Sequence, residues 1–268
     1  MSNAIQNTML IPLWSRAQAS RLYPEILVDQ QAINITKKLE HDFSKISASF
    51  NEFAAMSHLV RAKSMDDAIC SFTKKHPKAA VVDIGAGLDT SFSRVDNKTL
   101  RWFDLDLEDA LDFRNSIIPK PEKTTQIPKS VFDVSWFDDI GFSKEESAIF
   151  IAAGVFYFFP EEEIRELLVK MAEAFPGGEL VFDANSSEAL AISNKMMQNS
   201  GNTDAIMNFS VDDPLVFESW SPKIMVTYAG SRFGETPRLP QMSDTTLENM
   251  KSCDANNSIL QIHLTFLE

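Results

Sequence analysis

Apolar positions in the first part of the chain recur every three or four residues, which is the spacing of one face of a helix. The spacing is clearest at residues 17–22, 29–39 and 51–72. It ends at Pro77, and a short apolar run follows immediately. We therefore predict that residues 1–76 form a helical segment, which we expect to act as a lid ahead of the main domain.

From residue 77 onwards the pattern changes to short apolar runs that alternate with helical stretches, of which 161–175 is the clearest. Alternation of this kind predicts helices on both faces of a parallel sheet. The last run alternates apolar and polar residues, which favours an antiparallel strand at an edge. The predicted fold is α/β, a Rossmann-like, doubly wound, mostly parallel seven-stranded sheet over residues 77–268, with strands at 79–84, 100–105, 124–127, 148–153, 178–183, 223–228 and 260–266.

Charge and cysteine content narrow the range of partners. The formal net charge of −13 disfavours nucleic acid and anionic membranes, because phosphate contacts need clustered lysine and arginine. Cys70 and Cys253 are isolated, so they support neither a disulfide framework nor a zinc site. The chain shows neither a secretory signal nor an apolar run long enough for a membrane span, and we expect a cytoplasmic protein. Its oligomeric state is not indicated.

The most informative segment follows the first predicted strand and reads Asp-Ile-Gly-Ala-Gly over residues 83–87. Gly85 and Gly87 would let the backbone turn sharply and approach a ligand, although a simple tight turn would also use them. An acid about 20 residues beyond such a turn is placed to bind ribose hydroxyls. Asp106 at the end of the second strand fits this role, with Asp104 as the rival.

The same segment also bears on the type of nucleoside. A dinucleotide fingerprint would place a third glycine where this chain has Thr90, and no basic cluster is available for a diphosphate. The acid before the turn, Asp83, also points to a cofactor site. An uncharged, thioether-linked nucleoside fits better than NAD. An NAD-dependent oxidoreductase and a non-catalytic cofactor-binding module are the alternatives.

Several segments together resemble the leucine carboxyl methyltransferase family, in particular its bacterial polyketide-type O-methyltransferase branch. They are residues 83–94, 102–109, 130–136, 152–158 and 175–183. The resemblance implies a class I S-adenosylmethionine-dependent methyltransferase fold with S-adenosylmethionine as cofactor. It also implies a set of cofactor-binding positions, namely Arg16, Arg61, Asp83, Gly85, Gly87, Asp106, Asp133, Val134 and Ala153.

Most of the implied positions have an expected role. Gly85 and Gly87 would pass beneath the methionine part of the cofactor, and Asp106 would bind the ribose. Asp133 and Val134 would flank the adenine. Arg61, and Arg16 from the lid, would pair with the cofactor carboxylate, although Arg61 could equally be a surface or ion-pair arginine. Ala153 stands where family members often carry Glu, so a contact of that carboxylate is absent or made by the backbone.

The expected reaction is methyl transfer to a carboxylate or to a phenol or other hydroxyl of a small molecule. Tyr157 is the candidate catalytic residue, because it could orient an acceptor oxygen, but it could also be a core aromatic. We interpret the four histidines as structural or exposed. The segment 186–222 is expected to form the acceptor pocket, or else to contribute core packing, through Met196, Met197, Met207, Phe209, Phe217 and Trp220.

Overall fold

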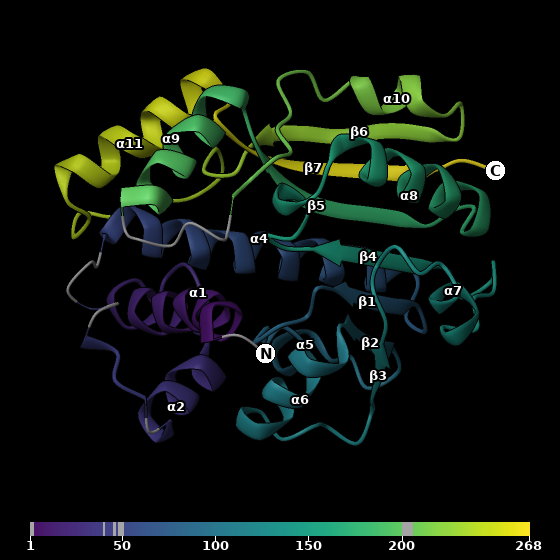
Figure 1. The fold of residues 1–268 in the computed structure, drawn as a ribbon, viewed down its shortest axis with the longest axis horizontal. Helices are drawn as coiled ribbons and strands as arrows, with labels where there is room; N and C mark the ends of the chain where they lie inside the picture. The colour runs from purple at the N-terminus through teal and green to yellow at the C-terminus, as the bar shows by residue number, and fades with distance from the viewer. Residues whose placement is uncertain (1–2, 40, 45–46, 48–50, 200–205) are drawn as a thin grey trace.

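The structure is a computed structural model. It describes residues 3–39, 41–44, 47, 51–199 and 206–268 (Figure 1). The side chains of Met196 and Met197 lie outside the described part, although their backbone belongs to a helix.

Among the described residues of the N-terminal part, three helices are defined, as the spacing of apolar residues predicted. They are α1 (Asn3–Leu22), α2 (Gln30–Lys38) and α4 (Glu52–Lys75). Two of them start at side-chain caps, because Asp29 accepts a hydrogen bond from the N–H of Ala32 and Asn51 accepts one from the N–H of Ala54. None of the helices among the described residues is both long and apolar enough to span a membrane.

The seven predicted strands are confirmed and form one sheet in the order β3-β2-β1-β4-β5-β7-β6. Only β7 runs against the others, so the sheet is mostly parallel. The strands are β1 (Ala80–Ile84), β2 (Arg101–Asp106), β3 (Thr124–Pro128), β4 (Ala148–Ala152), β5 (Glu179–Asn185), β6 (Ile224–Ser231) and β7 (Ile259–Phe266).

The expected place of the last strand was wrong in one respect. β7 is antiparallel, as predicted, but it lies between β5 and β6, and the edge strand is β6. The alternation of apolar and polar residues along β7 suggested that one face of the strand is exposed to solvent. Gln261 is nevertheless buried and forms a hydrogen bond with His263. A polar residue that finds a partner within the sheet can therefore occupy an interior strand.

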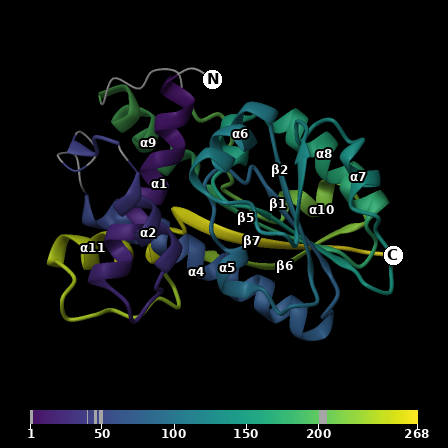
Figure 2. The same ribbon diagram turned by 90° about the horizontal axis from the view of Figure 1, so that it is seen from below.

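Helices cover both faces of the sheet (Figure 2). On one face, α8 (Glu161–Ala174) and α10 (Val216–Trp220) pack with Phe150 and Phe182 in the largest core cluster. On the other face, the C-terminal half of α4 packs through Ile69 and Phe72. The remaining helical elements are α5 (Phe92–Val95), α6 (Glu108–Ile117), α7 (Trp136–Asp139), η1 (Phe156–Phe158), α9 (Ser187–Asn199) and α11 (Asp244–Asn256).

Helices from both ends of the chain gather beyond the carboxyl ends of the parallel strands, where α1, α2, α9 and α11 lie (Figure 1). Met56 and Leu59 of α4 share a core cluster with Phe233 and with Met250 of α11. Glu52, at the start of α4, also accepts a hydrogen bond from Thr246 Oγ1 of α11 at 2.6 Å. The N-terminal helices are thus packed against the end of the main domain.

Candidate active site

The glycine turn follows β1 at the carboxyl edge of the sheet. Gly85 and Gly87 have φ angles of +66° and +39°, which other residues rarely adopt. A Cβ atom on Gly85 would lie 2.6 Å from Cγ2 of Val155, which follows β4. The turn therefore packs closely against the chain after β4, and Gly85 has no room for a side chain.

Two acids at the end of β2 have different surroundings. Asp106 accepts hydrogen bonds from the N–H groups of Gly87 and Leu107, each at 2.8 Å, and is half-buried. Asp104 is buried, accepts a hydrogen bond from Trp102 Nε1 at 2.8 Å and lies beside Arg114. Burial raises the pKa of both carboxyls. Asp106 is thus the acid that adjoins the glycine turn.

Asp83 lies in β1 directly before the turn. It is buried, and its Oδ2 atom has no hydrogen-bond partner among the described residues. Burial, followed by the nearby carboxylates of Asp89 and Asp104, raises its pKa well above the ordinary value. A buried, unpartnered carboxyl oxygen is costly unless a ligand donates to it. The ammonium group of S-adenosylmethionine is such a donor, so this position fits the cofactor.

Arg114 of α6 is a residue that sequence reasoning missed. Its Nη1 donates to the backbone carbonyls of Gly87 at 2.9 Å and Asp89 at 2.7 Å, and it is buried. Its guanidinium therefore binds the backbone of the glycine turn. Nothing in the local sequence marks it, because its partners are backbone atoms about 25 residues earlier in the chain.

Arg16 brings α1 to the same turn. It is buried, and it donates to the carbonyl of Leu88 at 2.9 Å and to Asp29 Oδ2 at 3.1 Å. Burial alone would raise the pKa of Asp29, but Arg16 and Arg94 hold it below its ordinary range. This network connects α1 and the start of α2 to the glycine turn through charged side chains.

Arg61 of α4 lies at the end of β4. Its guanidinium occupies the space where a Cβ on Gly154 would stand, and Gly154 has a φ of +77°. The Nη1 atom of Arg61 lies 3.4 Å from Asp183 Oδ2 in β5. The position of Arg61 is thus compatible both with binding of the cofactor carboxylate and with a role as an ion-pair partner.

Tyr157 in η1 belongs to a buried polar network. Its hydroxyl donates to Asp183 Oδ2 at 2.7 Å and accepts from Arg232 at 3.2 Å. Burial and the adjacent Asp183 carboxylate raise the pKa of Tyr157. The hydroxyl keeps its proton at neutral pH, so its chemistry here is that of a hydrogen-bonding group and not of a base. Asp183 ends the resembling segment 175–183, but neither it nor Arg232 was singled out, because the contacts that connect them join residues far apart in the sequence.

Asp133 and Val134, the positions expected to flank the adenine, lie on the loop after β3. Asp133 is exposed, and hydrogen bonds from the side chain and from the backbone N–H of Ser135, the latter at 3.2 Å, lower its pKa. Val134 is partly buried against the main core. Ala153, directly after β4, packs against the core cluster on the α4 face. Asp133 and Val134 therefore lie after β3, whereas Ala153 lies after β4.

His58 of α4, which was interpreted as structural or exposed, lies close to several charged side chains. Burial and the charges of Arg61, Arg16 and Arg232 lower its pKa well below 6.5. Its Nδ1 atom is buried and has no partner within the described part of the chain. It is a neutral imidazole in a cationic environment.

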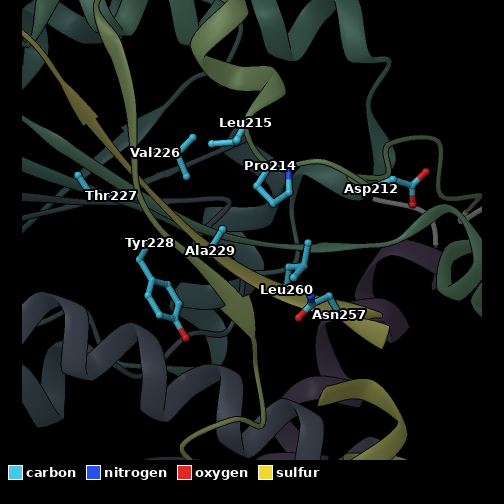
Figure 3. A pocket seen from close by; sticks show the side chains of 9 residues that line it. All are labelled: Asp212, Pro214, Leu215, Val226, Thr227, Tyr228, Ala229, Asn257 and Leu260. Atoms are coloured by element: carbon cyan, nitrogen blue, oxygen red, sulfur yellow. The ribbon is translucent and has the colours of Figure 1, made fainter. Parts of the chain in front are cut away.

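The described part of the segment 186–222 contributes both to the core and to a cavity. Phe209 and Phe217 are buried in the main cluster, as the packing alternative proposed. A cavity of about 390 Å³ lies between residues 212–215 and β6 (Figure 3). It is lined by Asp212, Pro214, Leu215, Val226, Thr227, Tyr228, Ala229, Asn257 and Leu260. None of the glycine-turn residues lines it, so we do not assign the reaction to this cavity.

A mostly parallel sheet with the order 3-2-1-4-5-7-6, a glycine turn after β1 and an acid at the end of β2 is the fold of a class I S-adenosylmethionine-dependent methyltransferase. Residues 4–172 match the model of the leucine carboxyl methyltransferase family. The chain belongs to this family and is an S-adenosylmethionine-dependent O-methyltransferase. This result excludes the NAD-dependent oxidoreductase alternative.

The chain is similar to one curated relative in sequence and to solved structures in fold. The tetracenomycin polyketide synthesis O-methyltransferase TcmP of Streptomyces glaucescens is 26% identical over 219 residues, which cover 81% of this chain and 79% of TcmP. A Thermobifida fusca protein assigned as a methyltransferase has a TM-score of 0.60 at 12% identity, covering 95% of this chain and 94% of its own. The plantazolicin methyltransferase BpumL has a TM-score of 0.52 at 13% identity, covering 98% and 100%. At these identities the two structures show the fold alone.

Proposed function

We propose that the chain transfers a methyl group to a carboxylate or hydroxyl oxygen of a small molecule, with the acceptor bound at the carboxyl edge of the sheet. The similarity to TcmP, an O-methyltransferase of polyketide synthesis, supports a small-molecule acceptor. The observation that carries the proposal is the buried, unpartnered Oδ2 of Asp83 directly before the glycine turn. It would provide an acceptor for the cofactor's ammonium group beside the glycine turn.

The remaining contacts follow from the positions of the side chains. Asp106 would accept hydrogen bonds from the ribose hydroxyls while it continues to hold the N–H of Gly87. Asp133 and Val134 would flank the adenine from the loop after β3. Arg61 and Arg16 would approach the cofactor carboxylate from α4 and α1 and form charge-assisted hydrogen bonds.

S-adenosylmethionine supplies an electrophilic methyl group on a sulfonium. The protein's contribution is to hold the acceptor oxygen in line with that methyl group and to exclude water. A carboxylate acceptor is already anionic and needs no base. For a hydroxyl acceptor, Tyr157 can orient the oxygen but cannot take its proton, since burial and Asp183 keep its own proton in place.

We also propose that residues 1–76 act as a lid and that residues 186–222 border the acceptor. The contact of Arg16 with the carbonyl of Leu88 supports the first part. Hydrogen bonds from the N–H groups of Asn208 and Phe209 to the carbonyl of Tyr157 support the second, because they connect this segment to η1, which follows β4.

Two experiments test the proposal. Calorimetric titration with S-adenosylmethionine, S-adenosylhomocysteine and NAD should give binding of the first two alone. Methyl transfer should then be measured by mass spectrometry on matched acceptors, namely aromatic carboxylic acids and the corresponding phenols. Binding of the cofactor without transfer to any acceptor of either class would favour a non-catalytic binding module.

A further inference from the structure

Asp183 of β5 is the centre of a buried charge cluster. Its Oδ1 accepts a hydrogen bond from the N–H of Gly154 at 2.6 Å, and its Oδ2 accepts one from the hydroxyl of Tyr157 at 2.7 Å. Two guanidinium groups, those of Arg61 and Arg232, form ion pairs with the same Oδ2. The cluster therefore holds two positive charges against one negative charge.

The two arginines are not held equally. Arg232 makes a close ion pair with Asp183, donates to Ser57 Oγ at 2.9 Å and donates to the Tyr157 hydroxyl at 3.2 Å. Arg61 reaches Asp183 through Nη1 alone, at 3.4 Å. The side chain of Arg232 is 4% exposed and that of Arg61 is 14% exposed. Arg232 is therefore the fixed partner, and Arg61 is the one able to turn toward a ligand.

The helix α4 places both contacts on one face. Ser57 and Arg61 are four residues apart, so they lie one above the other on the side of the helix that meets β5. His58 in the same turn is neutral, because burial and the three surrounding arginines lower its pKa. It does not add to the charge of the cluster. An uncompensated buried charge is costly, and the excess positive charge here favours an anionic ligand group beside Arg61.

We propose that Arg232 is a positioning residue that neutralises Asp183 and thereby keeps Arg61 available for the cofactor carboxylate. Without Arg232, the buried carboxylate of Asp183 would take Arg61 as its ion-pair partner and draw it away from the ligand. The inference rests on the proposed function, in which Arg61 binds that carboxylate. It assigns roles in cofactor binding to Asp183 and Arg232, which both lie outside the residues 4–172 that match the family model.

The test compares two ligands by calorimetry. S-adenosylhomocysteine carries the amino-acid carboxylate, whereas 5′-methylthioadenosine lacks it. We expect Arg232→Met to weaken S-adenosylhomocysteine at least tenfold and to leave 5′-methylthioadenosine within about twofold. Arg232→Lys should recover part of the loss, because it keeps the charge. The matched control is Arg238→Met, since Arg238 forms a more exposed ion pair with Asp254, and it should change neither affinity.

A double variant separates this role from a structural one. In Arg232→Met with Asp183→Asn, the carboxylate that would capture Arg61 is gone, so the affinity for S-adenosylhomocysteine should return toward wild type. Equal losses for both ligands, or no recovery in the double variant, would overturn the proposal. If Arg232→Met does not fold, the Lys variant and the double variant carry the test.

Failure of the proposed function has a different signature. If wild-type protein does not bind S-adenosylhomocysteine, or if Arg61→Met leaves its affinity unchanged, the assignment of Arg61 is wrong and the inference falls with it. If Arg61→Met weakens S-adenosylhomocysteine selectively but Arg232→Met does not, the role of Arg232 alone is refuted.

Discussion

The carboxylate of Asp106 accepts a hydrogen bond from the backbone N–H of Gly87 at 2.8 Å and so joins the end of β2 to the glycine turn. Its other oxygen accepts from the N–H of Leu107. Each carboxylate oxygen can accept a second hydrogen bond, so this arrangement leaves capacity for two ribose hydroxyls. The acid therefore fixes the shape of the turn and is available to bind a ligand at the same time.

We predict that Asp106→Ala weakens S-adenosylmethionine binding at least tenfold, or about 1.4 kcal/mol. The ribose hydroxyls would lose their charged acceptor, and the N–H of Gly87 would lose its partner. Asp104→Ala should instead lower thermal stability, because it leaves the buried Arg114 without its carboxylate. Calorimetry and thermal unfolding on both variants check this. The opposite pattern, in which only the change at Asp104 affects affinity, would reassign the ribose acid.

The glycine turn should not tolerate a side chain. Gly85→Ala adds a Cβ that would meet Val155 at 2.6 Å, in a backbone conformation that alanine rarely adopts. We expect cofactor binding to be lost, and Gly87→Val should have the same effect. Gly177→Ala is the matched control, because Gly177 has a φ of +81° but nothing within 4 Å of the added atom. The control should share the backbone strain and keep the affinity. Unchanged binding in Gly85→Ala would place the ligand elsewhere.

The glycine turn and the strands could be predicted from the sequence because their signals are local. The run at residues 79–84, for example, is apolar apart from Asp83, since the strand is covered on both faces. The turn glycines and Asp106 lie within a short stretch at fixed spacing. Local composition therefore predicted the strands, and it also predicted the glycine turn and the acid at the carboxyl ends of β1 and β2.

The charge network could not be predicted in the same way. Asp183 meets Arg61 and Arg232 across 122 and 49 residues of sequence. Arg114 binds backbone carbonyls, which leave no trace in the sequence of their own segment. Such partners are identified only when the fold brings them together. The position of β7 was missed for a related reason. Its alternating pattern is typical of an edge strand, but Gln261 and His263 hydrogen-bond each other, so the interior of the sheet accommodates these polar residues.

A pH dependence follows from Asp83. Burial raises its pKa well above 3.8, so the folded protein retains a proton that the unfolded chain has already released. The contribution of this carboxyl to stability therefore falls as the pH rises from about 3.8 through the folded-state pKa. Cofactor affinity should change in the opposite direction, because the ligand ammonium favours the ionised carboxylate.

Asp83→Asn should accordingly raise the melting temperature at neutral pH while it weakens S-adenosylhomocysteine at least tenfold. Its affinity should also depend less on pH than that of the wild type. Thermal unfolding and calorimetry across pH 5 to 8 measure both effects. Full affinity in the Asn variant would show that the unpartnered oxygen does not face the ligand.

The last prediction concerns the N-terminal helices. Arg16 connects α1 to the carbonyl of Leu88 in the glycine turn, and Arg61 extends from α4 over Gly154. Binding of an anionic carboxylate between them should strengthen both attachments, because charge-assisted hydrogen bonds are the strong ones. Closure of a segment in this way shields a reacting centre from water. We expect hydrogen exchange to slow around residues 12–30 and 55–65 when S-adenosylmethionine is added. Residues of α8, which pack on the opposite face, should serve as the unchanged reference. Equal exchange with and without the cofactor would mean that these helices are a static part of the core, held by the contacts of Met56 and Leu59 with α11.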